Sequence, residues 1–361
     1  MEDVVYLVTE EKMRQVHKNE DGETIYPDDF GGIYQDGDHF VMNIVENNDQ
    51  NAPIFPQQSA TRRIAEERGV AVQTVKYSLN DLNEASREII GRARNDGSTN
   101  VIYVARDDKN NKLEVGVSST DESAIKEVTA QFSGDEGMLV FVMADEIVDD
   151  VEALTEQEAQ NFVSAEADRA ADSIYIYAPG DKIITRVTHY TNPISYSYYG
   201  SSFGYGLYTN RFGAFGFMMS GHTTKSDNFV YQKANSSADI VGTIRAENNT
   251  YIGGDWALAT FNNATTTQYG GFYSAWVGQY VTAYGYTSGQ RGGTVLKLNV
   301  NFTTGPSCMV QATYTSAGGD SGGGVFYSNS PVGLNRGHGT SGGVAVAYFT
   351  PASQYMGSSV Y

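Results

Sequence analysis

The chain has 361 residues, which is long enough for two domains, and 40% of its residues are hydrophobic. Its formal net charge of −19 argues against nucleic acid as a partner, because phosphate binding depends on clustered Lys and Arg. No stretch approaches the roughly 20 apolar residues that span a bilayer, so we expect no membrane partner either.

The cysteine content and the first residues narrow the class further. Cys308 is the single cysteine, which rules out an intrachain disulfide and leaves too few thiols for a Cys-based zinc site. We expect no metal and no cofactor. The first residues, MEDVVYLVTEEK, are acidic and lack the basic-then-apolar pattern of a leader. We therefore expect a secreted protein whose leader precedes this numbering or, alternatively, a cytoplasmic one.

Charge and composition divide the chain near residue 173. Residues 1–173 hold 15 Lys and Arg against 37 Asp and Glu, a net of −22, and residues 174–361 hold 9 against 6, a net of +3. The second part also contains 29 of the 39 Gly and 20 of the 25 Tyr, a composition typical of many short strands joined by turns. The two parts therefore attract each other electrostatically.

The first part alternates helical and strand patterns, which predicts a small α/β domain over residues 1–148. The apolar spacing of Leu82, Ala85, Ile89 and Ile90 marks one face of a helix. In chain order the predicted elements are a hairpin over Phe30–Ile44 that turns at Asp36-Gly37, helices over Ile64–Val75 and Asp81–Ala93, strands Val101–Val104 and Lys112–Val117 around a polar turn, a helix over Glu122–Gln131 and a strand over Met138–Met143.

An acidic stretch follows the predicted α/β domain. Residues 145–172 are rich in Asp, Glu and Ala, and they have almost no large apolar residue after Phe162. This composition predicts a solvated, partly helical linker, which we assign to residues 149–173.

The second part, residues 174–361, shows strand-length apolar runs separated by turn residues, which predicts an all-β barrel or sandwich. Its tail, Pro351–Met356, has a plausible helical turn. The predicted strands are Ile183–Val187, Ala214–Met219, Ile240–Ile244, Trp256–Phe261, Tyr280–Tyr284, Thr294–Val300, Met309–Tyr314, Gly324–Tyr327 and Gly343–Phe349.

The stretch AGGDSGGGVF, residues 317–326, surrounds one acid and one hydroxyl with five glycines. It is either a flexible turn between strands or a loop in which Ser321 is a nucleophile and its neighbouring N–H groups face a substrate oxygen. A serine nucleophile needs a base, and histidine has the suitable pKa. Among the five histidines, His222 follows the apolar run FGFMMS and a glycine, which predicts a strand end facing a cleft.

A carboxylate that orients the base is easier to select, because few acids lie between His222 and Asp320. Asp255 opens DWALATF after two glycines, so its side chain can be buried at the head of an apolar strand, where an acid needs a partner. Asp239, in SADIVGTI, is the second candidate.

The stretches GFMMSGHTT, GGDWALATF and AGGDSGGGVF, in that order, resemble the three motifs of chymotrypsin-like serine proteases, in the branch of streptogrisin and alpha-lytic protease. GQRGGTVLKL and AYFTPASQYMGSSVY continue this resemblance, which covers nearly all of residues 176–361. FGGIYQDGDHFVMNI and VIYVARDDKNNKLEVGV resemble the paired hairpins of the pro-regions in that branch. The resemblance implies an α+β chain: a small α/β pro-domain followed by an all-β, trypsin-like double β-barrel.

The resemblance also implies roles for the residues of the three motifs. Ser321 attacks the peptide carbonyl, His222 transfers the proton and Asp255 holds the imidazole. The N–H groups of Gly319 and Ser321 form the oxyanion hole. Asp320 turns inward to hold the loop, and Arg291 is the nearest basic residue that could neutralise it.

A substrate pocket is implied beside the nucleophile. Thr315 and Ser316 lie at its base, and the substrate-pairing segment matches Asn335 to His338. The pocket is small and polar, and Gly337 separates its two basic residues, Arg336 and His338. Either basic residue could favour an acidic substrate residue before the scissile bond. The alternative is that both basic side chains point to solvent.

The whole chain is thus expected to be a bacterial serine endopeptidase zymogen that acts on protein or peptide substrates. Its pro-region binds the protease domain in cis, assists folding, inhibits, and is removed by a cut between Ser164 and Ser173. Two alternatives remain open at this point. One is a catalytically silent trypsin-like protein that binds through the Tyr-rich stretch YTNPISYSYYGSSFGYGLY, and the other is an intracellular quality-control serine protease.

Overall fold

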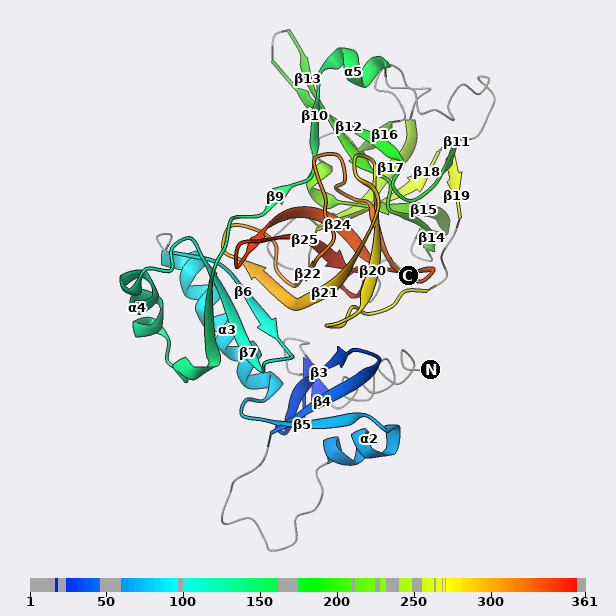
Figure 1. The fold of residues 1–361 in the computed structure, drawn as a ribbon. Helices are drawn as coiled ribbons and strands as arrows, with labels where there is room; N and C mark the ends of the chain where they lie inside the picture. The colour runs from blue at the N-terminus through cyan, green and yellow to red at the C-terminus, as the bar shows by residue number, and fades with distance from the viewer. Residues whose placement is uncertain are drawn as a thin grey trace, which may run out of the picture. The chain divides into compact units, whose positions relative to one another are not determined.

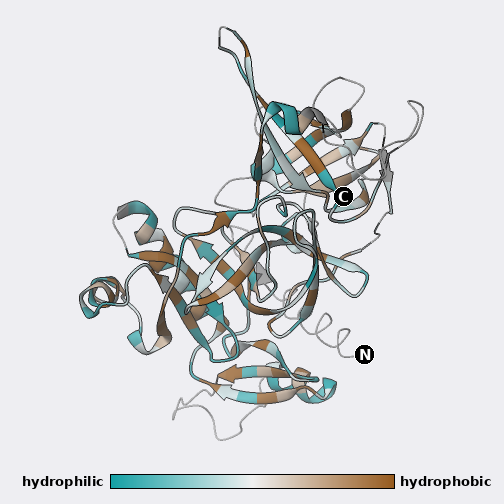
Figure 2. Ribbon diagram, turned by 45° about the horizontal axis from the view of Figure 1, so that its top comes forward, coloured by the Kyte–Doolittle hydropathy of each residue, from teal (hydrophilic) through white to brown (hydrophobic). Residues whose placement is uncertain are grey.

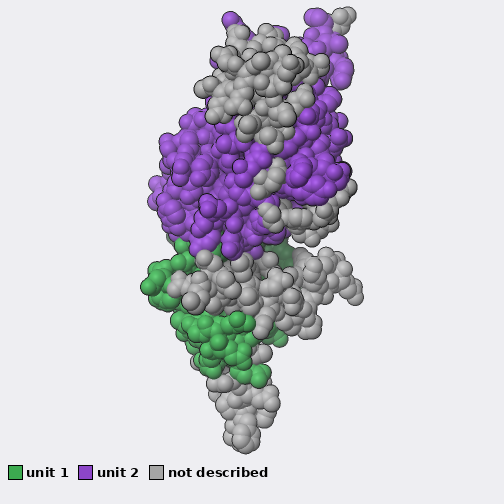
Figure 3. All heavy atoms as spheres, turned by 90° about the vertical axis from the view of Figure 1, so that its right-hand side faces the viewer, with its two compact units in different colours: residues 1–145, 276–279, 295–304 green, residues 146–275, 280–294, 305–361 purple. Residues whose placement is uncertain are grey.

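The structure is a computed structural model in which the chain forms two compact units (Figure 3). Unit 1 comprises residues 1–145, 276–279 and 295–304, and unit 2 comprises residues 146–275, 280–294 and 305–361. Two short segments of the sequence's second part therefore group with unit 1. The structure describes residues 17–18, 24–45, 60–96, 100–161, 175–191, 193–209, 212–224, 228–231, 240–248, 255–262, 264–267, 269 and 271–355.

In its described residues, unit 1 contains three α-helices and two small sheets, besides the short strand pair His17–Lys18 and Thr24–Ile25 (Figure 1). One sheet has the order β3-β4-β5, and in the other β6, β7 and β8 are adjacent. Apolar residues of α3 and of strands β6 and β7, among them Leu82, Val104 and Leu113, form one buried core. The elements are β1 (His17–Lys18), β2 (Thr24–Ile25), β3 (Phe30–Asp36), β4 (His39–Val45), α2 (Ala60–Arg68), β5 (Ala71–Val75), α3 (Leu79–Asp96), β6 (Val101–Asp107), β7 (Lys112–Val117), α4 (Glu122–Gln131), η1 (Glu136–Met138) and β8 (Leu139–Met143).

One helix predicted in unit 1 extends too far at its C-terminal end. The helix predicted over Ile64–Val75 ends at Arg68, and Ala71–Val75 forms β5, parallel to β4. Gly69 has φ +65°, a left-handed conformation that ends helices. The residues after it include the β-branched Val72, Thr74 and Val75, which favour a strand. The other elements predicted for this unit are present, with small shifts at their ends.

Unit 2 is built mainly of strands (Figure 1). Its elements are β9 (Val148–Asp149), β10 (Glu152–Leu154), α5 (Glu156–Asn161), β11 (Tyr175–Tyr177), β12 (Lys182–His189), β13 (Ser195–Ser202), β14 (Tyr205–Thr209), β15 (Ala214–Met219), η2 (Gly221–Thr223), β16 (Phe229–Tyr231), β17 (Ile240–Asn248), β18 (Trp256–Phe261), β19 (Ala264–Thr266), β20 (Tyr280–Gly285), β21 (Gly289–Phe302), β22 (Met309–Ala312), β23 (Gly324–Tyr327), β24 (Ser330–Ser341), β25 (Val344–Pro351) and η4 (Ala352–Gln354). Strand β21 contributes its later residues to unit 1.

Two sets of strands make up most of unit 2. An eight-stranded sheet has the order β10-β13-β12-β16-β17-β18-β15-β14, and its neighbouring strands are antiparallel. The second set has the order β20-β23-β24-β25-β22. Alternating hydrophobic positions along these strands (Figure 2) supply separate apolar cores. Phe203, Phe217 and Met219 belong to one core, and Tyr205 and Leu334 to another.

All nine strands predicted in the second part are present, and six further strands in the described residues were not predicted. These are β11, β13, β14, β16, β19 and β24. The segments of β13 and β14 belong to the Tyr-rich stretch, in which Tyr198 and Tyr205 are buried, whereas Tyr190, Tyr196 and Tyr208 are exposed. The segment of β24 is interrupted by Pro331 and three glycines, so its sequence lacks the apolar alternation of a strand.

The acidic stretch after residue 145 differs most from its prediction. Residues 148–154 are not a solvated linker, because they form β9 and β10 and the side chain of Asp150 is fully buried. Helix α5 agrees with the partly helical character that we expected. The predicted cleavage region, Ser164 to Ser173, lies outside the described residues. Within the part of the chain that the structure describes, no helix has the length and apolar character needed to cross a membrane.

Candidate active site

Ser321 lies in the turn between β22 and β23, where glycines permit a path that other residues resist. Gly319 has φ +101° and Gly322 has φ +86°, both in the left-handed region. A Cβ at Gly322 would lie 2.7 Å from the carbonyl oxygen of Ser202, and one at Gly323 would lie 2.0 Å from that of Tyr284. The glycines therefore let neighbouring backbone pack directly behind a buried serine.

His222 and Asp255 come from two neighbouring strand ends. His222 lies in the η2 turn that follows β15, and Asp255 immediately precedes β18, which pairs with β15. The backbone N–H of His222 donates to Asp255 Oδ1 at 2.7 Å, and the ring Nδ1 lies 2.6 Å from Oδ2. The carboxylate thus fixes both the backbone and the ring of His222. A ring that donates through Nδ1 leaves Nε2 free to accept a proton.

The hydroxyl of Ser321 completes the cluster. Its Oγ lies 2.8 Å from Nε2 of His222 and also 2.8 Å from the carbonyl oxygen of Arg336. The hydroxyl has one proton, so it donates either to the imidazole or to this carbonyl at a given moment. The structure therefore brings together the three residues that the motifs indicated. Asp239, the second candidate for the acid, lies outside the described residues.

The charge of Asp255 is well supported. Burial disfavours ionisation of this carboxyl, but the charges of His222 and Arg336 and the hydrogen bonds from His222 outweigh burial and lower its pKa to about 2. Arg336 Nη1 lies 3.1 Å from Asp255 Oδ2. Thr350 holds the backbone of Asp255, because its hydroxyl donates to the Asp255 carbonyl and lies near the Asp255 N–H. The acid is therefore ionised at neutral pH and fixed in place.

Two backbone N–H groups beside Ser321 point at one oxygen. The N–H of Gly319 donates to the carbonyl oxygen of Asp150 at 2.6 Å, and the N–H of Ser321 donates to the same atom at 3.0 Å. These are the two donors that the sequence assigned to an oxyanion hole. Here they hold a peptide carbonyl that belongs to the chain itself.

Asp320 turns inward as expected, but Arg291 does not contact it. The Asp320 carboxylate accepts N–H groups from Thr287, Ser288 and Ala317. Arg291 is exposed, and its guanidinium donates to the carbonyl of Gln290. The prediction that Arg291 neutralises Asp320 is therefore wrong. Three backbone N–H groups hold this carboxylate, so it needs no basic side chain.

Two of the five predicted pocket residues, Ser316 and His338, lie at the side chain of Asp150. His338 Nδ1 lies 2.5 Å from Asp150 Oδ1, and Asn335 Nδ2 donates to Oδ2 at 3.1 Å. The Ser316 hydroxyl also favours the ionised form of Asp150, although it falls short of regular hydrogen-bond geometry. Thr315 is exposed and lines a small cavity with Ser316 and Asn335, without a hydrogen bond to Asp150.

Gly337 contributes a backbone contact, whereas Arg336 contributes its side chain. Gly337 pairs with Asp149 between β24 and β9, as a backbone contact. The side chain of Arg336 does not enter the pocket beside Asp150. It lies between Asp149 and Asp255, with Nη2 2.9 Å from Asp149 Oδ1. It is largely buried, so the alternative that it points to solvent is wrong for this residue.

Sequence reasoning missed two contributors to this site. Asn335 was noted only as part of the substrate-pairing segment, yet its amide binds both Asp150 and the hydroxyl of Tyr314. Asp150 itself was read as part of a solvated linker. Its run of acids carries no pattern that distinguishes a buried carboxylate from an exposed one, so no sequence signal could have found it.

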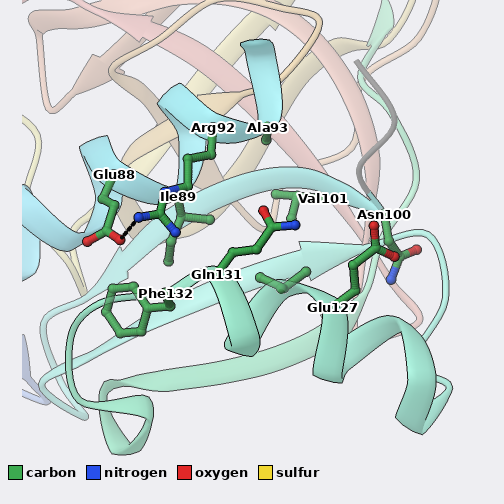
Figure 4. A pocket seen from close by; sticks show the side chains of 10 residues that line it. Glu88, Ile89, Arg92, Ala93, Asn100, Val101, Glu127, Gln131 and Phe132 are labelled. Atoms are coloured by element: carbon green, nitrogen blue, oxygen red, sulfur yellow. Dashed lines mark ion pairs between the residues drawn. The ribbon is translucent and has the colours of Figure 1, made fainter. Parts of the chain in front are cut away.

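The second cavity of note lies in unit 1, between α3 and α4 (Figure 4). Ile89, Val101 and Phe132 supply apolar walls, and Glu88 and Arg92 form an ion pair of 2.9 Å at its edge. It holds no pair of a nucleophile and a base. Across the described ranges, no three His, Cys, Asp or Glu side chains gather as a metal site requires.

Comparison with known proteins gives structural matches only. No protein-family model matches this chain, and no curated protein matches it. Thermobifida fusca protease A is 21% identical and matches 50% of this chain and 96% of its own, with a TM-score of 0.39. For the Nocardiopsis protease the values are 19%, 51% and 96%, with a TM-score of 0.41.

A third solved structure is described as a glutamic acid specific serine protease that uses a histidine triad in substrate binding. It is 25% identical and matches 51% of this chain and 99% of its own, with a TM-score of 0.38. An alpha-lytic protease homologue, 22% identical with a TM-score of 0.37, is also among the matches.

Proposed function

We propose that this protein is a serine endopeptidase that hydrolyses peptide bonds through an acyl-enzyme on Ser321. The observation that carries the proposal is one continuous set of contacts. Asp255 holds His222, His222 faces the Ser321 hydroxyl, and two N–H groups beside Ser321 bind a peptide carbonyl oxygen. A nucleophile, its base, the orienting acid and the oxyanion donors are the complete set that acyl transfer requires.

The proposed reaction assigns a role to each residue of the site. Ser321 Oγ attacks the carbonyl carbon while its proton passes to His222 Nε2, and Asp255 stabilises the imidazolium that forms. The N–H groups of Gly319 and Ser321 stabilise the oxyanion. His222 then gives the proton to the leaving amine, and water hydrolyses the ester by the reverse sequence. Asp320 keeps the loop in shape through its three backbone donors.

We also propose that unit 1 is the α/β pro-region of a secreted, bacterial, trypsin-like double-barrel zymogen. The support is that β3 with β4, and β6 with β7, form the two antiparallel hairpins whose sequences resemble the paired hairpins of such pro-regions. A fold rich in non-local strand pairs reaches its transition state slowly, so a template that offers a surface could speed it.

Covalent labelling tests the enzymatic part of this proposal. A fluorophosphonate should modify Ser321 in the wild-type protein, and mapping the adduct by mass spectrometry identifies the residue. Peptide hydrolysis should fall by at least about 10⁴-fold in Ser321→Ala and in His222→Ala. Ser330→Ala, at the first residue of β24, is the matched control and should behave as the wild type. Labelling at other residues, with activity retained in Ser321→Ala, would rule out the proposed reaction.

Refolding tests the pro-region part. A denatured fragment that begins at Val151 should regain peptide hydrolysis when residues 1–145 are added in trans, and should remain inactive without them. Equal recovery in both samples would contradict a folding role for unit 1.

A further inference from the structure

The chain itself crosses the candidate active site in an extended conformation. On one side of Ser321, β9 pairs antiparallel with β24, with Asp149 opposite Gly337 and Val148 opposite His338. On the other side, β10 pairs antiparallel with β13, with Glu152 opposite Gly200. Both pairings belong to unit 2, in which Figure 1 labels β9 and β10 along one continuous segment. Backbone pairing of this kind binds an extended peptide to a sheet edge.

Asp150 lies between these two paired strands, at the catalytic residues. Its N–H donates to the carbonyl oxygen of Arg336 at 3.1 Å, and its own carbonyl oxygen accepts from Gly319 and Ser321. The two donors of an oxyanion hole select the carbonyl that a nucleophile attacks. The bond that follows this carbonyl joins Asp150 to Val151.

The side chain of Asp150 is held by groups suited to a carboxylate. His338 faces one carboxylate oxygen, and the amide of Asn335 donates to the other. The Asp150 side chain is fully buried, whereas 41% of the His338 side chain is exposed. A buried carboxylate without such donors would be strongly unfavourable. The pocket therefore matches an acidic side chain rather than an apolar one.

Asp149, the residue before Asp150, also has a partner of opposite charge, Arg336. Arg336 lies between Asp149 and the catalytic acid Asp255, 2.9 Å from an oxygen of the first and 3.1 Å from an oxygen of the second. After Val151, Glu152 Oε2 accepts from Lys182 Nζ at 2.6 Å. Charged groups of the site therefore fix the segment on both sides of the Asp150–Val151 bond.

We infer that the Asp150–Val151 bond is the site of self-cleavage in cis, and that the pocket of Asn335 and His338 selects peptides with Asp or Glu before the scissile bond. This inference rests on the proposed serine endopeptidase function. It places the cut upstream of the region between Ser164 and Ser173 that the sequence suggested.

The step uses only groups already present and water. Ser321 Oγ bonds to the Asp150 carbonyl carbon, and the hydroxyl proton moves to His222. The carbon–nitrogen bond to Val151 breaks, and the proton from His222 makes the new amino group of Val151. Water then attacks the ester, which releases Asp150 as a free carboxyl end and returns the proton to Ser321.

The test follows the intact mass and N-terminal sequence of the purified full chain at several protein concentrations. We expect a new chain that begins at Val151, with a half-time independent of concentration because the substrate is in cis. Ser321→Ala should stay uncut. Asp150→Asn preserves the shape of the side chain but not its charge, and should be cut at least about 100-fold more slowly. Glu146→Gln changes an exposed acid of the same segment and should be cut as the wild type.

Peptides offered to the processed protein test the pocket without altering the fold. In a series that differs only before the scissile bond, Asp and Glu should be cut at least about 100-fold faster than Asn, Gln and Phe. A preference for large apolar residues would overturn the selection of acids. It would do so even if the Asp150→Asn chain fails to fold.

The possible failures can be told apart. If phosphonate labels Ser321 and peptides are hydrolysed, but no chain ever begins at Val151, the inference fails and the endopeptidase proposal stands. Equal cutting of the wild-type and Asp150→Asn chains overturns the role of the carboxylate. If Ser321 is never labelled and no peptide is hydrolysed, both the inference and the proposed function fail.

Discussion

Two fully buried carboxylates lie within the same active site, and their surroundings shift their pKa values in opposite directions. Burial raises the pKa of Asp150, and the nearby Ser316 hydroxyl, His338 and Asn335, which favour the ionised form, do not outweigh it. Burial has the same effect on Asp255, but the charges of His222 and Arg336 reverse it and lower the pKa to about 2. This difference fits two roles: Asp255 is a permanent catalytic residue, whereas Asp150 belongs to a segment bound in the pocket as a substrate would be.

The largest effect should come from changing the permanent acid. Asp255→Asn removes the charge that stabilises the imidazolium and reverses the preferred tautomer of His222, so kcat for peptides should fall about 10⁴-fold. The same substitution at Asp150 should leave the kcat of the processed enzyme unchanged, because the segment has been cut and can leave. Steady-state kinetics on both processed variants measures this. A fall of less than tenfold in Asp255→Asn would remove the distinction between the two acids.

A second test disturbs the donors that hold the carbonyl of Asp150. In Gly319→Ala, the φ of +101° is strained and the new Cβ would lie 2.3 Å from the hydroxyl oxygen of Thr287. The N–H should turn away from the oxyanion, and both self-cleavage and peptide kcat should fall by about 10²-fold or more. Gly342→Ala is the control, since φ is also positive there and no atom lies within 4 Å of the added Cβ. Equal activity of the two variants would exclude Gly319 as a donor.

The opposite pKa shifts predict opposite effects of pH on stability. The pKa of Asp255 lies below its usual value of 3.8, so this acid stabilises the fold above pH 3.8 by about 2 kcal/mol, and the contribution is lost as pH falls from 3.8 towards 2. The raised pKa of Asp150 means that its ionisation costs stability as pH rises above 3.8.

Urea unfolding between pH 2 and pH 7, in a Ser321→Ala background that prevents cutting, measures both effects. The stability lost in Asp255→Asn should shrink on acidification. The stability of Asp150→Asn relative to its parent should increase as the pH rises. Parallel curves for the two substitutions would contradict the comparison.

The smallest effect should come from Arg291. Because the Asp320 carboxylate is held by backbone donors, Arg291→Gln should leave kcat/KM within about twofold of the wild type. Asp320→Ala is the contrast and should lower activity, because it leaves those donors unpaired. A loss in Arg291→Gln as large as that in Asp320→Ala would restore the electrostatic role that the sequence suggested.

The sequence was most informative where a local rule leaves few choices. Positive φ at Gly319 and Gly322 follows from the glycine-rich loop, and the three motifs identified the side chains that meet in the site. Strands such as β15 and β18 have their predicted bounds because their apolar runs are bounded by turn residues.

The parts that were missed depend on contacts distant in the sequence. Asp150 is buried by residues about 170 to 190 positions later in the chain, and nothing in its acidic neighbourhood indicates this. The segment of β24 forms a strand despite its glycines because β23 and β25 pair with it on both sides. Residues 71–75 extend a helical pattern, yet pairing with β4 makes them a strand.

The most direct test of the account is the rate at which Ser321 reacts with peptide phosphonates that carry Asp or Phe at the position next to phosphorus. The account predicts a single adduct on Ser321 that forms at least about tenfold faster with the acidic reagent. Absence of an adduct on Ser321, or equal rates with the two reagents, would contradict it.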